Sequence, residues 1–130
     1  MKVDDDARCF VCGPENPRGL HAQFDIDHEQ FSATGHVQLS ADFQGWQDVV
    51  HGGILATLLD EVSIYACRSI AAKCVTAELA VRYKKPVPVA TPLQLTARVV
   101  EQKKRVLLVE ASLMIDGVVY TEASTKVFKL

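Results

Sequence analysis

Residues 51–66 read HGGILATLLDEVSIYA, and this pattern predicts a helix that is entered through two glycines. Apolar residues recur with a period of about 3.6 residues, which is typical of a helix with a buried stripe. The opposite side, centred on Asp60, carries small or apolar residues where a surface helix would carry Lys, Glu or Gln. We therefore expect a helix that is buried nearly all round and contains a carboxylate. The stripe consists of Leu55, Leu58, Leu59, Val62 and Ala66, widened by Ile54 and Tyr65.

The glycine pair and the carboxylate allow two interpretations. Without Cβ atoms, Gly52 and Gly53 let a ligand approach the backbone. The first N–H groups of a helix lack intrahelical partners and can polarise a carbonyl, and Asp60 would then act as base or nucleophile. The alternative is a buried helix whose carboxylate reaches solvent at its edge. The spacing alone favours neither interpretation.

Size and composition predict one compact domain that spans residues 1–130. The chain is 48% hydrophobic, which is enough for a core of its own. It has no apolar run near 20 residues and starts with the polar segment 1–6, so we expect a cytoplasmic protein without membrane contact. The formal net charge of −2 predicts no nucleic-acid partner.

The N-terminal segment 1–19 is expected to be a cap or loop that contains a Cys-x-x-Cys-Gly motif. Cys9 and Cys12 are spaced as in half of a zinc ribbon. A zinc site needs about four ligands, and a second Cys-x-x-Cys is missing. His21, Cys67 or Cys74 would complete a site only by folding close to the motif. Two packed thiols are therefore the favoured interpretation, and no metal and no cofactor are predicted.

The remaining chain predicts an α+β fold with an antiparallel sheet. Two strands precede the helix and four follow it as a meander, so the order does not support a parallel doubly wound sheet. The simplest packing wraps about six strands around one long helix. Dimerisation would cover the second helix face and an edge strand, so we expect a homodimer or a dimer of dimers. The expected strands are 20–27, 31–39, 76–83, 93–102, 106–116 and 118–128.

The chain resembles the hotdog-fold acyl-CoA thioesterases of the PaaI and 4-hydroxybenzoyl-CoA type that carry the acid on the central helix. The resemblance covers nearly the whole chain. It rests on His51-Gly52-Gly53, on Asp60 nine residues after that histidine, and on the segment TAELAVRY at 76–83. The opening CFVCGPENPRGL at 9–20 is similar to a cap found in one bacterial branch.

This resemblance implies hydrolysis of an acyl-CoA thioester, with coenzyme A as part of the substrate. Asp60 would be the base or nucleophile, and the Gly52 N–H would face the thioester carbonyl. His51 would orient the loop or the carbonyl oxygen, and Gly53 would let the acyl group pass. Thr76 resembles the Ser/Thr that helps to position water, expected from the partner subunit.

Two positions depart from the family pattern. Many relatives carry Asn or Gln six residues before the histidine, where this chain has Gly45; Gln44 or Gln47 would have to substitute. Asp60 is also followed by Glu61, which lies at the edge of the apolar stripe and is the reserve acid.

Further candidates for substrate binding lie outside the motif. Trp46, together with Phe43, would line an acyl pocket or fill the core beneath its loop. Arg82 and Lys84, with Lys85, would hold phosphates of coenzyme A, as would 103–105; a solvated basic turn is the favoured interpretation of each set.

Two other functions fit the same architecture. An acyl-thioester dehydratase or hydratase also uses a helix carboxylate, but pairs it with a catalytic histidine on the approaching loop. A non-catalytic acyl-CoA binding module would explain the missing Asn or Gln at Gly45. The position of His51 directly at the helix start favours the thioesterase.

Overall fold

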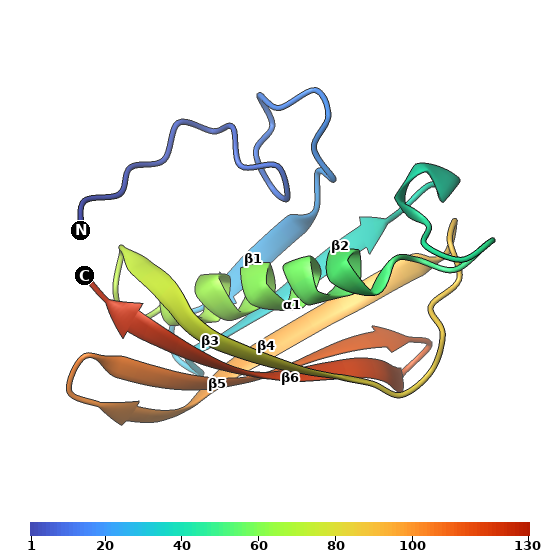
Figure 1. The fold of residues 1–130 in the computed structure, drawn as a ribbon. Coiled ribbons are helices and arrows are strands. Elements are labelled where there is room, and N and C mark those ends of the chain that lie inside the picture. Colours follow the sequence, from blue (N-terminus) through green and yellow to red (C-terminus); the bar gives the residue numbers. More distant parts are fainter.

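The computed structural model describes residues 1–130 and contains one long helix, one short 3-10 helix and six strands. Figure 1 shows the helix lying across one face of a curved sheet. No helix has the length and apolar character needed to cross a membrane. In chain order the elements are β1 (Gln23–Asp27), β2 (Ser32–Gln38), η1 (Ala41–Phe43), α1 (Gly52–Cys67), β3 (Cys74–Tyr83), β4 (Pro92–Lys103), β5 (Val106–Ile115) and β6 (Val118–Lys129).

Helix α1 packs its apolar stripe against the concave face of the sheet, as its period predicts. Leu58 and Leu59 have no exposed surface, so truncating either to alanine would cost about 2–5 kcal/mol. Within the helix only Gly53 is exposed, which agrees with the expectation of a helix that is buried nearly all round. The buried helix residues are Leu55, Leu58, Leu59, Val62, Ser63, Ala66 and Cys67.

The sheet is antiparallel throughout and has the order β1-β2-β4-β5-β6-β3. The predicted wrapping of about six strands around one helix is confirmed. The predicted meander of four strands is wrong for β3, which pairs with β6 at the far edge rather than with β4. The reason is that α1 carries the chain across the sheet before β3 begins, and residues 84–91 bring it back to β2.

The predicted hairpin at Asp116-Gly117 is present, and both residues have positive φ angles of 49° and 79°. Such angles match the two-residue turns that fit the twist of antiparallel strands. Strand β1 begins three residues later than expected. Residues 20–22 alternate as a strand does, but their backbone pairs with the N-terminal loop: Leu20 N–H donates to Phe10 O and Ala22 N–H to Val11 O.

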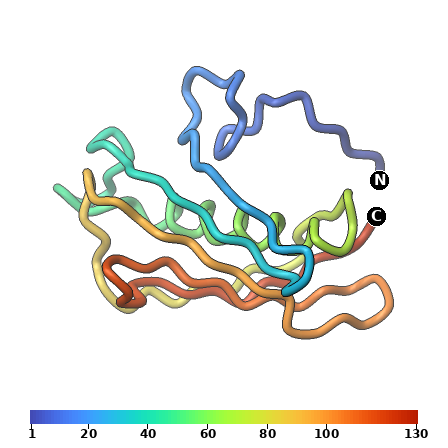
Figure 2. The backbone as a smooth tube through the Cα atoms, turned by 180° about the vertical axis from the view of Figure 1, so that it is seen from behind, coloured from blue at the N-terminus to red at the C-terminus, as the bar shows by residue number.

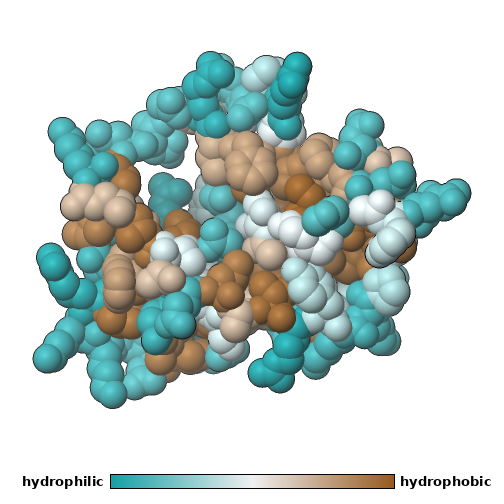
Figure 3. All heavy atoms as spheres, in the orientation of Figure 1, coloured by the Kyte–Doolittle hydropathy of each residue, from teal (hydrophilic) through white to brown (hydrophobic).

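The N-terminal loop lies on the same side of the sheet as α1, beyond the helix, as Figures 1 and 2 show from opposite sides. Val11 and Leu20 are buried and join the core, so the loop is packed onto the domain rather than extended away from it. On the face drawn in Figure 3, apolar side chains remain open in a band at the level of α1 and β3.

Candidate active site

The loop between β2 and α1 is fixed by backbone hydrogen bonds on both sides of His51. His51 N–H donates to Phe43 O at 2.9 Å, and Val50 N–H donates to Val87 O at 2.8 Å. Val87 has no exposed surface and anchors this contact in the core. Gly45 N–H closes the turn by donating to Val49 O at 2.9 Å. The start of α1 is therefore held rigidly although it follows a segment without regular structure.

His51 is the N-cap of α1. Its Nδ1 accepts the N–H of Gly53 at 2.9 Å, and its carbonyl accepts the N–H groups of Ile54 and Leu55. Because Nδ1 acts as acceptor, the ring proton resides on Nε2. The N–H of Gly52 has no acceptor in the chain. The helix start thus presents one unpaired donor, reinforced by the helix dipole.

A pocket of about 390 Å³ opens at this donor. It is lined by Gly45, Trp46, Val50, His51 and Gly52. Trp46 is 87% exposed, so the interpretation that it fills the core beneath the loop is wrong. Phe43 is half-buried and packs against the core. The pocket therefore combines a polar helix start with one open aromatic side chain.

Tyr83 supports the helix start and was not identified from the sequence as a site residue. Its hydroxyl donates to Gly52 O at 2.8 Å. A Cβ added to Gly52 would lie 3.4 Å from the Tyr83 ring, so the ring packs directly against this glycine. No sequence signal links two residues that are 31 positions apart; only the placement of β3 beside α1 brings them together.

Asp60 and Thr76 form the second part of the site. The Thr76 hydroxyl donates to Asp60 Oδ1 at 2.6 Å, and both side chains are half-buried. The pairing of β3 with β6 shifts register between Thr76 and Glu78, which identifies a bulge at Ala77. Bulges commonly re-aim a neighbouring side chain, here toward the helix. Thr76 was expected to act from the partner subunit, whereas this hydrogen bond lies within one chain.

The two parts of the site are far apart along the helix. Gly52 and Asp60 are separated by eight residues, which corresponds to about 12 Å at 1.5 Å per residue. One thioester carbonyl cannot lie at the Gly52 N–H and next to the Asp60 carboxylate of the same chain. Within one chain, the Gly52 N–H and the Asp60 carboxylate are therefore two separate parts.

Glu61 points away from this arrangement, toward the N-terminal loop. Its carboxylate lies 3.5 Å from Cys9 Sγ through Oε2 and 3.5 Å from Cys12 Sγ through Oε1. Burial raises the pKa of the Glu61 carboxyl, while the adjacent Cys12 and Cys9 thiols act in the opposite direction. Burial also raises the pKa of Cys12 to about 12. The structure thus places the reserve acid with two thiols and not with Thr76.

The two glutamines near Gly45 differ in their contacts. Gln44 Oε1 accepts the N–H of Asp48 at 3.0 Å, so its carbonyl stabilises the loop itself. Gln47 is exposed and makes no hydrogen bond within the chain. A Cβ on Gly45 would lie 3.2 Å from the His51 ring, so a larger residue there would crowd the N-cap. Gln47 is the glutamine with a free amide.

The basic residues proposed for phosphate binding lie on the surface. Arg82 and Lys84 reach the same carboxylate, Glu122, at 3.8 and 3.3 Å. Lys85 lies over the Tyr120 ring, 5.6 Å from its centroid. These contacts are of the kind that solvated side chains make, and the role of these residues in substrate binding remains a prediction.

Solved structures of known proteins have the same fold as this chain. A solved thioesterase superfamily protein superposes with a TM-score of 0.87 at 29% identity, over 95% of this chain and 61% of the other. A phenylacetic acid degradation-related putative thioesterase from Ralstonia eutropha JMP134 superposes with a TM-score of 0.80 at 23% identity, over 88% and 89% of the two chains. These likenesses show that the chain has the hotdog fold.

The chain belongs to the thioesterase superfamily, whose family model matches residues 47–120. This range includes His51, Gly52, Asp60 and Thr76. The chain is also 32% identical over 89 residues to the acyl-coenzyme A thioesterase THEM4 of Mus musculus, over 67% of its own length. It spans 38% of the length of that curated relative. A Streptococcus mutans UA159 protein solved bound to acetyl-CoA has the same fold, with a TM-score of 0.74 at 19% identity, over 82% and 87% of the two chains.

Proposed function

We propose that this protein hydrolyses acyl-CoA thioesters to a free acid and coenzyme A. The observation that carries the proposal is the unpaired N–H of Gly52 at the start of a buried helix, in a residue that lines an open pocket. A donor of this kind holds the carbonyl oxygen and stabilises the negative charge that develops there during attack. Membership of the thioesterase superfamily and the likeness to an acyl-CoA thioesterase support the reaction class.

The second catalytic group is Asp60 of another protomer. The distance of about 12 Å along α1 separates Gly52 from Asp60 of the same chain, so a complete site needs the helix start of one chain and the carboxylate of another. A twofold dimer supplies two such sites, because each chain contributes a helix start to one and an acid to the other. The open apolar band along α1 and β3 is the surface suited to this assembly.

The reaction follows from these positions. Asp60, held by the Thr76 hydroxyl, accepts a proton from a water molecule, and the water oxygen bonds to the thioester carbon. The carbonyl oxygen becomes negatively charged against the Gly52 N–H. The C–S bond then breaks, the thiolate of coenzyme A leaves, and the proton held by Asp60 is available to it. His51 Nε2–H, at the pocket wall, is a second donor for the carbonyl oxygen.

A thiol-release assay with a panel of acyl-CoA substrates tests the proposal. The panel contains phenylacetyl, benzoyl, short straight-chain and long straight-chain thioesters, and compares the wild type with Asp60→Asn. We expect release by the wild type and a loss of about 100-fold or more in the variant, because Asn cannot accept the proton. Equal rates in both proteins would show that Asp60 is not the acid of the site.

The structure supports the dehydratase interpretation less well. That chemistry needs an imidazole nitrogen that can take a proton from the substrate carbon, whereas His51 Nδ1 accepts the Gly53 N–H and the other nitrogen, Nε2, therefore carries the ring proton. The assay separates the two readings, since a hydratase would convert an enoyl-CoA without releasing thiol. Tight acyl-CoA binding with neither reaction would instead identify a binding module.

A further inference from the structure

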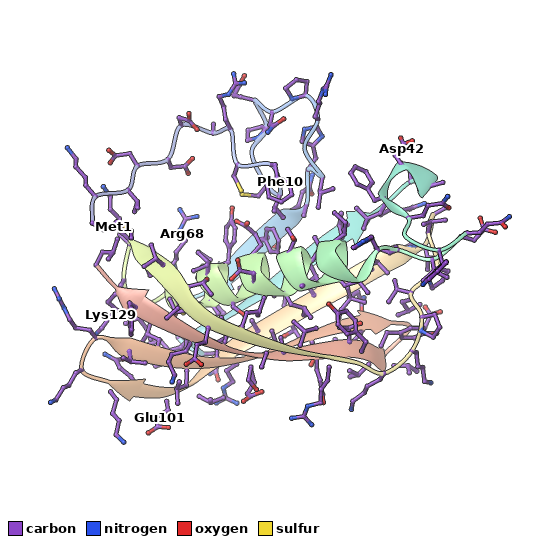
Figure 4. The ribbon with its side chains drawn as sticks, viewed as in Figure 1. Met1, Phe10, Asp42, Arg68, Glu101 and Lys129 are labelled. Atoms are coloured by element: carbon purple, nitrogen blue, oxygen red, sulfur yellow. The ribbon has the colours of Figure 1, made fainter.

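A second cluster of reactive side chains lies between α1 and the N-terminal loop. It consists of Cys9, Cys12 and Glu61, whose ligand atoms all lie within 4.8 Å of one another. All four cysteines of the chain are free thiols, so Cys9 and Cys12 are not joined to each other. Figure 4 shows sulfur of the N-terminal loop beside Phe10, on the side that faces the helix. The proposed hydrolysis uses none of the three residues.

The spacing within the cluster matches a tetrahedral metal site. Both thiol sulfurs lie close to the same carboxylate oxygen: Glu61 Oε1 is 3.7 Å from Cys9 Sγ and 3.5 Å from Cys12 Sγ. A tetrahedral Zn²⁺ with Zn–S of about 2.3 Å and Zn–O of about 2.0–2.2 Å places sulfur and oxygen ligands about 3.5–3.7 Å apart. The sulfur–oxygen separations therefore match those of ligands around one ion, and all three ligand atoms lie within 4.8 Å of one another.

The charge around Glu61 also favours a cation. The carboxylate is half-buried, yet it takes part in none of the ion pairs of the chain. Arg68, the C-cap of α1, lies over the Tyr65 ring at 5.0 Å from its centroid and acts on Glu61 through its charge without forming an ion pair. A half-buried carboxylate that faces two thiols and forms no ion pair is an arrangement that a bound metal ion would complete.

The loop geometry is built to present both sulfurs. Gly13 N–H donates to Cys9 O at 2.7 Å and closes a tight turn. A Cβ on Gly13 would lie 2.5 Å from Cys9 N and 2.6 Å from Ala7 O, both backbone atoms, so only glycine fits. The turn is anchored on the core by Val11. The thiols thus sit on a rigid backbone that approaches α1 directly.

We propose that Cys9, Cys12 and Glu61 bind one Zn²⁺ ion, which ties the N-terminal loop to the central helix. Two thiolates and a carboxylate suit a borderline-soft divalent ion such as Zn²⁺, and exclude Mg²⁺ or Ca²⁺ as the preferred ion. Three protein ligands leave one of the four positions for water. The sequence did not reveal this site, because the third ligand comes from the helix, 49 residues after Cys12, and not from a second Cys-x-x-Cys motif.

Metal titration of the full-length, reduced and metal-stripped chain tests the proposal. Co²⁺ is the probe, because thiolate ligation gives a near-ultraviolet charge-transfer band and tetrahedral geometry gives intense visible bands. We expect saturation at one equivalent and displacement of Co²⁺ by Zn²⁺. Zn²⁺ should also slow amide hydrogen exchange in residues 7–22 and raise the melting temperature by roughly 5–10 °C at saturating metal.

Four variants assign the ligands. Cys12→Ser should lose the charge-transfer band, and Glu61→Gln, which keeps the shape of the side chain, should weaken Zn²⁺ binding by at least about tenfold. Cys74→Ser and Glu15→Gln are the matched controls, since they remove a thiol and a carboxylate elsewhere, and both should bind as the wild type does. Each variant is first checked for native circular dichroism, and Glu61→Gln carries the test if Cys12→Ser does not fold.

Two results would overturn the proposal. One is the absence of any Co²⁺ or Zn²⁺ binding by wild-type protein whose four thiols are shown to be reduced. The other is unchanged metal binding by folded Cys12→Ser or Glu61→Gln. Both results leave the proposed thioester hydrolysis untouched, because Asp60 and Gly52 do not belong to the cluster.

Discussion

Gly52 is the residue on which the proposed chemistry depends most directly, and a pair of substitutions isolates its N–H. Gly52→Pro removes the donor, yet proline is favoured at the first helical position and His51 already has the extended ψ of 133° that a following proline requires. Gly52→Ala keeps the donor and adds a Cβ in ordinary contact with Tyr83. We expect kcat to fall about 10²–10³-fold in the proline variant and by far less in the alanine variant.

Steady-state kinetics and a thermal melt on both variants provide the measurement. Equal loss of activity in the two proteins would show that the space beside Gly52 matters and its N–H does not. Unaltered activity in a folded proline variant would remove the helix start from the mechanism.

Thr76 is a positioning residue, because it reaches the reaction only through Asp60. Thr76→Val removes the hydroxyl that donates to Asp60 at 2.6 Å and keeps the branched shape. We expect kcat to fall roughly 10- to 100-fold with little change in KM, since the carboxylate loses its fixed orientation. Thr76→Ser restores the donor and should recover most of the rate. A valine variant as active as the serine variant would assign Thr76 a purely structural role.

For single residues, the sequence predicts which residues belong to the site better than it predicts which side chains contact each other. His51, Gly52 and Asp60 follow from a glycine pair and a carboxylate within one predicted helix. The partner of Asp60 could be inferred only by resemblance, and its hydrogen bond within the same chain depends on the bulge between Thr76 and Glu78. A bulge is set by how two strands pair, which no local pattern records.

Gly13 in the N-terminal turn and Gly117 in the hairpin between β5 and β6 are required for different reasons. Substituting each glycine by alanine distinguishes these reasons. Gly13 has no room for a side chain, since its Cβ would meet backbone atoms of Cys9 and Ala7. Gly117 has open space but a φ of 79°. We expect Gly13→Ala to cost about 2–4 kcal/mol and Gly117→Ala about 1–2 kcal/mol.

Urea denaturation of both variants in the same buffer tests this order. The Gly13 variant should also show faster amide exchange in residues 7–22, while the Gly117 variant should not. A Gly13 variant as stable as the wild type would mean that the turn can open without cost in free energy. The conclusion that Cys9 and Cys12 lie on a rigid backbone would then be wrong.

Secondary structure elements were predicted well wherever periodicity was strong. The central helix and the strands after it agree with the sequence to within a few residues. The edge position of β3 was missed, because chain order suggests pairing with β4. Strand β1 was predicted too long, since residues 20–22 alternate like a strand but bond to residues 10 and 11 of the N-terminal loop. Both errors concern hydrogen bonding between segments that are far apart in the sequence, and the alternation of apolar residues does not predict which segments pair.

For the molecule as a whole, the decisive quantity is the length of the helix between the donor and the acid. Eight residues of α1 place Gly52 and Asp60 about 12 Å apart, so the chain alone holds two half-sites. The same chain also has an edge strand, β3, and an open apolar band. Assembly of two chains would cover the band and join the half-sites, which links the proposed oligomeric state to the proposed activity.

Isolation of a mixed dimer is the measurement that tests this account most directly. Asp60→Asn and Gly52→Pro chains carrying different affinity tags are co-expressed, and the heterodimer is purified through both tags. One of its two sites combines an intact Gly52 with an intact Asp60, so we predict about half of the wild-type activity from two inactive parents. A heterodimer no more active than its parent homodimers would contradict the proposal that each site is built from two chains.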